Sequence, residues 1–152
     1  MVLSTVRFRQ HEKSLMTSAL NADFDEFHGA SRTSQTAKGS KESLQIAEEV
    51  VQFCTDKLNI SSLKVHNHYF VRSTSNYSMD WHADALPDIS LCCIYYLTDH
   101  GEIHFNNQKI KCSPGLLCIF SPDEMHMVPV CTDTRLFARF DLSNVTESVD
   151  KN

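Results

Sequence analysis

The stretch RLFARFDL (residues 135–142) decides the fold, because every second side chain in it is apolar. Successive side chains of a β-strand point to opposite faces of a sheet. One face is apolar throughout: Leu136, Ala138, Phe140 and Leu142. The other face begins with two basic groups and an aromatic ring: Arg135, Phe137 and Arg139. The pattern predicts a strand that packs one face on a helix and turns two guanidinium groups into the interior of a barrel.

Six earlier runs have strand-like composition and are each bounded by turn-forming residues. They span residues 63–71, 89–97, 103–105, 108–112, 116–120 and 127–130. Seven short strands at close spacing after a helical start are typical of an antiparallel β-sandwich or an open barrel with helices behind it. We therefore predict a mainly β (α+β) fold backed by N-terminal helices.

The first third of the chain supplies the predicted helices. Apolar residues recur at helical spacing over 41–58 behind Ser40, a favourable N-cap, and residues 11–20 predict a shorter helix. Residues 1–10 favour an edge strand. The polar residues 21–40, and most of the segment between Tyr69 and Asp80, favour loops.

Length and charge restrict the domain organisation and the partners. A chain of 152 residues has the size of one domain, so we expect a single domain over 1–142, with its core at about 63–142, and a polar tail over 143–152. Residues 66–142 carry 5 basic and 9 acidic side chains, which argues against a phosphate backbone as partner.

The sequence gives little indication of membrane insertion or of disulfide bonds. No apolar run approaches the roughly 18 residues that cross a bilayer, and the start of the chain lacks the apolar segment of a secretory signal. We expect a cytoplasmic or nuclear location and no membrane partner. The 6 cysteines form no Cys-x-x-Cys motif and mostly lie in apolar runs, which favours buried free thiols over disulfides.

A candidate metal site begins at His82-Ala83-Asp84. Alternation along a strand lets His82 and Asp84 face one ion while Ala83 points away. A neighbouring strand must supply a third ligand, and we assign it to His126. Two imidazoles and one carboxylate leave three coordination positions open, as suits non-haem Fe(II) that binds a chelating cosubstrate and O₂. A structural zinc site would instead have four protein ligands, usually including thiolates.

Arg135 is the candidate for binding an acidic cosubstrate. A buried arginine without a partner is costly, and a dicarboxylate offers the planar acceptor that guanidinium matches. Tyr96, on the predicted strand 89–97, has a hydroxyl that could donate to the same carboxylate.

Five segments and one arginine carry a family resemblance. They are HAD (82–84), CIYYLT (93–98), GEIHF (101–105), PGLLCIF (114–120), HMVPV (126–130) and Arg135. In order and spacing they resemble the 2-oxoglutarate/Fe(II)-dependent dioxygenases, in particular the prolyl-4-hydroxylase-like branch. The resemblance implies a double-stranded β-helix (jelly-roll) core.

The resemblance also implies ligands and cofactors. Fe(II) would lie on His82, Asp84 and His126, and 2-oxoglutarate would chelate it while its far carboxylate meets Arg135 and Tyr96. O₂ would be the second substrate, with ascorbate as a supporting reductant. Tyr69 is a further cosubstrate-pocket candidate, with Tyr77 as its alternative. Arg139 has three possible partners: 2-oxoglutarate, an acidic neighbour or an acidic substrate.

Three functions remain open on the sequence. The first is hydroxylation of a protein, peptide or amino-acid side chain, or of a small molecule. The second is oxidative demethylation of nucleic acid, as in the AlkB-like branch, although the arginine pair of that branch is six residues apart and Arg135 and Arg139 are four apart. The third is a non-catalytic jelly-roll binding module, in which Arg139 would block the pocket.

Overall fold

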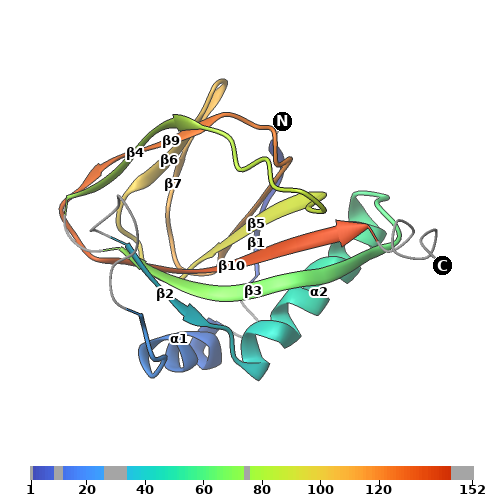
Figure 1. Cartoon of the computed structure of the whole chain (residues 1–152), viewed down its shortest axis with the longest axis horizontal. Helices are drawn as coiled ribbons and strands as arrows, with labels where there is room; N and C mark the ends of the chain where they lie inside the picture. Colours follow the sequence, from blue (N-terminus) through green and yellow to red (C-terminus); the bar gives the residue numbers. More distant parts are fainter. Residues whose placement is uncertain (1, 9–11, 26–33, 74–75, 145–152) are drawn as a thin grey trace.

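The strand predicted at 135–142 lies inside the larger of two antiparallel sheets (Figure 1). The computed structural model describes residues 2–8, 12–25, 34–73 and 76–144. The six-stranded sheet has the order β1 (Val2–Arg7), β8 (Leu116–Phe120), β5 (Leu91–Tyr96), β10 (Arg135–Asn144), β3 (Leu63–Ser73) and β2 (Ser34–Lys38). The four-stranded sheet has the order β4 (Tyr77–His82), β9 (His126–Cys131), β6 (Glu102–Phe105) and β7 (Gln108–Lys111). The two sheets form the predicted jelly-roll core.

The helices α1 (Glu12–Leu20) and α2 (Lys41–Lys57) cover one face of the six-stranded sheet, and the four-stranded sheet faces the other (Figure 1). The apolar face of β10 enters the core under the helices, where Ala138, Phe140 and Leu142 are fully buried. Ile46 and Val50 of α2 belong to the same core. Burial of such side chains contributes about 1.5–3 kcal/mol each. The other face of β10 is thereby turned toward the smaller sheet, as predicted.

Most of the predicted elements are confirmed. The helices, the N-terminal edge strand and all seven strands occur within a few residues of their predicted bounds. The prediction was wrong at three places. The expected loop 21–40 contains β2, the expected loop before Asp80 contains most of β4, and β10 continues to Asn144, so the start of the predicted tail is strand. Residues 145–152 lie outside the described part of the chain.

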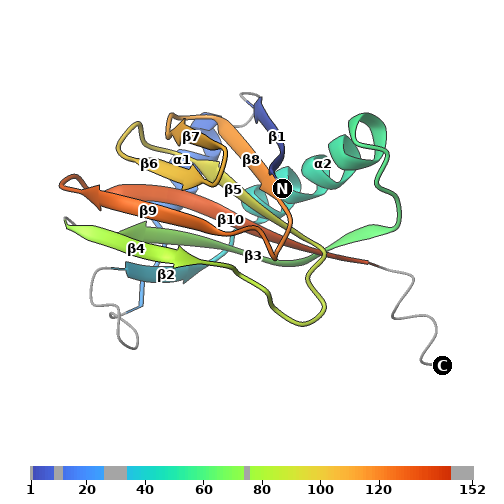
Figure 2. The ribbon, with the colours of Figure 1, turned by 90° about the horizontal axis from the view of Figure 1, so that it is seen from above.

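Figure 2 shows β2 and β4 along the same side of the molecule. Both are the outer strands of their sheets. β2 is mostly polar and half-exposed, whereas β4 alternates Tyr77, Met79 and Trp81 with polar residues but is mostly exposed. Residues of both strands line one pocket: Ser34 and Thr36 of β2, and Tyr77, Ser78 and Met79 of β4.

All six cysteines are buried and free, as expected. Burial raises the pKa of the Cys54 and Cys92 thiols to about 11. Within the described residues, none of the helices is both long and apolar enough to cross a bilayer.

The N-terminus of α2 is closed by a capping box. The Ser40 hydroxyl accepts a hydrogen bond from the Ser43 backbone N–H at 3.1 Å, and the Ser43 hydroxyl accepts one from the Ser40 N–H at 2.8 Å. Two N–H groups that a helix end leaves free are thus satisfied.

We expect Ser40→Ala to lower the free energy of unfolding by about 1 kcal/mol, because one of these N–H groups loses its acceptor. Urea unfolding of the two proteins measures the difference. Ser61→Ala, at an exposed position outside helices and strands, is the matched control and should change the value by less than about 0.5 kcal/mol. Equal midpoints for Ser40→Ala and wild type would contradict the capping assignment.

Candidate metal centre and cosubstrate pocket

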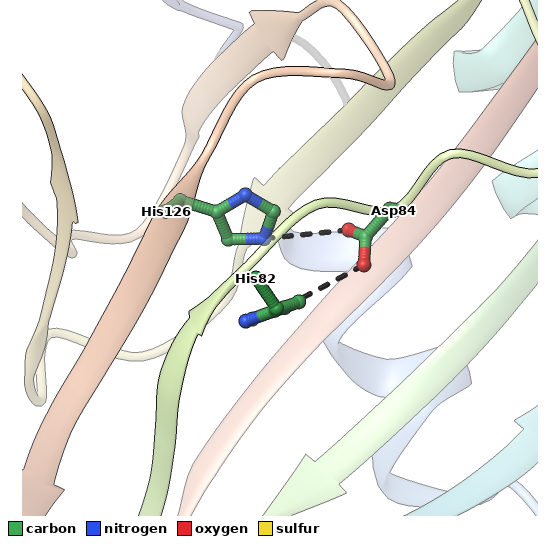
Figure 3. Close-up of side chains that lie close together, drawn as sticks. All are labelled: His82, Asp84 and His126. Carbon is green, nitrogen blue, oxygen red and sulfur yellow. Dashed lines mark ion pairs between the residues drawn. The ribbon is translucent and has the colours of Figure 1, made fainter.

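His82, Asp84 and His126 meet at one point between the sheets (Figure 3). His82 ends β4 and His126 begins β9, and the register of the two strands pairs them directly. Asp84 follows β4 by two residues. The Nε2 atoms of His82 and His126 lie 3.5 and 3.3 Å from the Asp84 carboxylate, and one ligand atom from each residue fits within 4.8 Å of the others. The structure thus brings the three predicted residues together.

The backbone orients both imidazole rings in the same way. His82 Nδ1 lies 2.7 Å from the carbonyl of Asp80, and His126 Nδ1 lies 2.9 Å from the carbonyl of Glu124. A carbonyl only accepts, so Nδ1 carries the proton in each ring. Each Nε2 then faces the Asp84 carboxylate, where a bound cation would meet both the nitrogen and a carboxylate oxygen. This donor arrangement is the usual one for metal-binding histidines.

The two histidines differ in burial. The His126 side chain is almost fully buried, and its ring packs against Phe120 and Phe105 at centroid distances of 5.1 and 5.7 Å. The His82 side chain is 24% exposed. One ligand is therefore fixed by the core, and the other lies on the open side of the site.

Arg139 approaches the same carboxylate from β10. Its Nη1 donates to Asp84 Oδ2 at 2.9 Å, and its Nε donates to Asp141 Oδ1 at 3.0 Å. An acidic neighbour, one of the three partners considered for Arg139, is thus in contact with it. Burial raises the pKa of Asp84, but the contacts with His126 and Arg139 outweigh burial and hold that pKa well below its usual value. Asp84 is thus kept ionised.

Arg135 lies at the other end of the site and has a different environment. It is 2% exposed, and its guanidinium carbon lies 5.9 Å from the ring centroids of Tyr77, Tyr96 and Phe137. Its Nη2 donates weakly to the Cys112 sulfur at 3.4 Å. Its Nε and Nη1 and the Tyr96 hydroxyl are buried, and none has a hydrogen-bond partner among the described residues. Three unpaired donors therefore surround one space.

Gly101 makes room for this arginine. A Cβ atom at Gly101 would lie 3.2 Å from both Cδ and Nε of Arg135, and the backbone φ of +85° is one that side-chain-bearing residues rarely adopt. The glycine between β5 and β6 thus lets the backbone pass close to the guanidinium.

A pocket of about 340 Å³ connects the two ends of the site. Its polar lining includes all seven predicted site residues: His82, Asp84, His126, Arg135, Tyr96, Tyr69 and Arg139. Apolar side chains form much of the remaining wall: Val71, Ile94, Ile103, Val128 and Phe137. The volume suits a small ligand. Although Arg139 lies in the wall, the pocket beside it is open.

The two candidate tyrosines, Tyr69 and Tyr77, lie against different arginines. Tyr69 pairs with Arg139 in the β3–β10 register, and burial raises its pKa to about 12, although the positive charge of Arg139 opposes this rise. Tyr77, the alternative, has its ring beside Arg135. Tyr77 is thus better placed than Tyr69 for a ligand of Arg135. Asp141, the second partner of Arg139, was not among the predicted residues, although it shares their strand face in the alternation of 135–141.

Comparisons with known proteins identify the fold. No protein-family model and no curated protein sequence matches the chain. Among solved structures, the viral collagen prolyl hydroxylase of Paramecium bursaria Chlorella virus 1, in complex with 2-oxoglutarate, has a TM-score of 0.71 at 16% identity, covering 93% of this chain and 95% of that one. A Pseudomonas putida prolyl-4-hydroxylase has a TM-score of 0.73 at 14% identity, covering 93% and 91%.

A third structure is a prolyl hydroxylase from Trichoplax adhaerens in complex with a hypoxia-inducible-factor peptide fragment. Its TM-score is 0.72 at 12% identity, and the match covers 98% of this chain and 86% of that one. The similarity extends over nearly the whole of each chain, although the identities are low. The chain therefore has the jelly-roll fold of solved 2-oxoglutarate/Fe(II) oxygenases, as the sequence resemblance implied.

Proposed function

We propose that the chain is a 2-oxoglutarate- and Fe(II)-dependent dioxygenase that hydroxylates a C–H bond. The observation that carries the proposal is one pocket with two complementary ends. At one end His82, Asp84 and His126 converge, and at the other the Arg135 guanidinium has unpaired donors. A metal and an acidic ligand bound side by side would satisfy both ends.

The donor set fits Fe(II). Two imidazole nitrogens and one carboxylate are the facial arrangement of non-haem iron oxygenases, and they leave positions for a cosubstrate and O₂. The Nδ1 hydrogen bonds of both histidines direct Nε2 toward the shared point, and the low pKa of Asp84 keeps its charge available. The three residues would hold the iron, and the protein would fix their orientation before it binds.

The pocket beside the metal end fits 2-oxoglutarate. Nε and Nη1 of Arg135 and the hydroxyl of Tyr96 would donate to its far carboxylate, which removes three unsatisfied buried donors at once. The rings of Tyr77 and Phe137 flank the guanidinium and limit the access of water. In this assignment Arg135 is the cosubstrate residue and Arg139 is not.

Bound Fe(II) would supply oxidising chemistry in which a substrate C–H bond becomes C–OH while O₂ and 2-oxoglutarate are converted to the new hydroxyl, succinate and CO₂. The chain contributes the orientation of ligand and metal residues, and its apolar wall excludes water from the space between them.

We infer a protein, peptide or amino-acid side chain as the substrate class. The supporting finding is that two of the solved neighbours are described as prolyl hydroxylases and a third as a collagen prolyl hydroxylase, one of them with a bound peptide fragment. The acidic charge of residues 66–142 does not favour nucleic acid, and the comparisons give the AlkB-like alternative no advantage. A single domain over 1–142 and a cytoplasmic or nuclear location stay predictions.

The proposal is tested by succinate release from 2-oxoglutarate with Fe(II), ascorbate and O₂, in the presence of peptide or methylated-oligonucleotide pools. We expect iron-dependent succinate formation that peptide pools stimulate. The controls are reactions without Fe(II), and reactions in which 2-oxobutyrate, which lacks the far carboxylate, replaces 2-oxoglutarate and propionate release is measured instead of succinate. Absence of turnover together with absence of Fe(II) binding would reject the proposal, and stimulation by oligonucleotide alone would replace the substrate class.

A further inference from the structure

The two arginines on the inner face of β10 have opposite environments, although they are the same residue type on one strand face. Arg135 leaves Nε and Nη1 without partners. Arg139 uses all three guanidinium nitrogens: Nη1 donates to Asp84, Nε to Asp141 and Nη2 to the Cys92 sulfur at 3.2 Å. The protein thus engages one N–H group on each nitrogen of Arg139, which is three of its five donors, whereas Arg135 has a single weak contact.

The buried Asp141 carboxylate holds the Arg139 guanidinium in position. The Asp141 side chain is only 4% exposed, and its carboxylate holds Nε at 3.0 Å. The Arg139 side chain itself is 12% exposed. A planar group held at one edge by Asp141 and Cys92 presents its remaining edge to Asp84 in a set direction. Asp84 Oδ2 thus has a fixed cationic partner on the side away from solvent.

We infer that Arg139 is a positioning residue that restricts Asp84 to binding the metal through one carboxylate oxygen. The inference rests on the proposed metal site. A carboxylate can bind a cation through one oxygen or through both. Oδ1 lies 3.5 Å from His82 Nε2, and Oδ2 lies 3.3 Å from His126 Nε2. Because the guanidinium already engages Oδ2 at 2.9 Å and places a full positive charge beside it, a metal ion held by the two rings competes poorly for that oxygen and uses Oδ1.

This restriction determines how many coordination positions of the metal remain open for other ligands. With one oxygen from Asp84, the three protein residues occupy three of six positions and leave three open. A chelating cosubstrate and O₂ together require all three. If Asp84 bound through both oxygens, only two would remain and O₂ would have no position beside a chelate. Arg139 thus preserves the reactive position without touching the ligand.

The test counts metal-bound water. Wild type, Arg139→Met and Arg139→Lys are loaded with Mn(II), which does not react with O₂ here, without 2-oxoglutarate. Broadening of the Mn(II) electron paramagnetic resonance signal by ¹⁷O-enriched water reports the number of bound waters, and titration of free Mn(II) gives Kd. Arg72→Met is the matched control, since Arg72 is a half-buried arginine of β3 whose guanidinium is held by Gln35 and is not in the pocket.

We expect three bound waters in wild type, in Arg139→Lys and in Arg72→Met, and two in Arg139→Met. Mn(II) should bind Arg139→Met at least about tenfold more tightly, because a repelling charge is lost and a ligand oxygen is gained. Three waters in Arg139→Met would overturn the inference even with a changed Kd, since charge alone would then explain the affinity.

Measurements on the wild-type protein distinguish failure of this inference from failure of the proposed function, and they do not depend on whether a variant folds. Two waters on wild-type Mn(II), with Mn(II) bound, would overturn the role of Arg139 and leave the metal site intact. Failure of wild type to bind Mn(II) or Fe(II) at all would instead reject the proposed function on which the inference rests.

Discussion

Replacing His82 by alanine should abolish iron-dependent succinate formation while the fold persists. The side chain supplies one of three metal-binding atoms, and loss of a direct ligand costs more than the 10- to 100-fold that loss of an outer partner typically costs. We therefore expect turnover to fall by more than about 100-fold. His82 is the better choice than His126, because it is 24% exposed and contributes no ring to the core, whereas the His126 ring packs against Phe120.

The expected cost in stability is about 1 kcal/mol or less, the worth of the single hydrogen bond from His82 Nδ1 to the Asp80 carbonyl. His104→Ala is the control, since His104 is also partly buried but pairs with Glu102 and lies outside the pocket. Thermal unfolding of the metal-free proteins and turnover of the iron-loaded ones are measured in parallel. Full turnover in His82→Ala would refute the metal-site assignment.

Replacing Arg135 by methionine should weaken 2-oxoglutarate binding without weakening the fold. A charge-assisted hydrogen bond is worth about 1.5–3 kcal/mol, so KM for 2-oxoglutarate should rise by roughly ten- to a hundredfold. The metal-free variant should melt at or above the wild-type temperature, because a buried guanidinium with two unpaired nitrogens is replaced by an apolar side chain of similar length. Stability and cosubstrate affinity should thus move in opposite directions.

A melting temperature that does not fall, together with a KM that rises, distinguishes a ligand-binding arginine from one that stabilises the fold. Arg72→Met provides the contrast: its guanidinium is satisfied by Gln35 and packs on the Phe24 ring, so its loss should lower the melting temperature and leave KM unchanged. Mn(II) affinity should stay unchanged in Arg135→Met. A clear fall in melting temperature with an unaltered KM would assign Arg135 to the fold rather than to the cosubstrate.

The parts of the fold that could be predicted are those in which burial imposes a period. Alternation in β10 identified both of its faces, and helical spacing behind Ser40 located α2 to within one residue. The edge strand β2 could not be found in the same way, because its sequence is polar. β4 has an alternation of Tyr77, Met79 and Trp81 with polar residues that the loop prediction overlooked, and only Tyr77 of the three is buried. The strand conformation of β2 and β4 depends on pairing with β3 and β9.

The site divides along similar lines. The family resemblance grouped His82, Asp84 and His126, which the structure brings together, whereas strand alternation does not account for Asp84, because β4 ends at His82. Neither could decide the partner of Arg139, which depends on the path of the chain after β4 that returns Asp84 to β10. The contact between Tyr77 and Arg135 was likewise hidden, because β4 was expected to be loop.

The two faces of β10 also limit where the chain tolerates insertions and deletions. A change of one residue in the turn between Cys131 and Arg135 that slipped β10 by one position against β3 and β5 would exchange its faces. Arg135 and Arg139 would then be turned into the helix-covered core, while Leu136 and Phe140 would line the pocket. Such a slip would take Arg139 away from Asp84, Arg135 away from the proposed cosubstrate site and the apolar side chains out of the core in one step. Lengthening a solvent-exposed turn such as Asn106-Asn107 would leave all three in place.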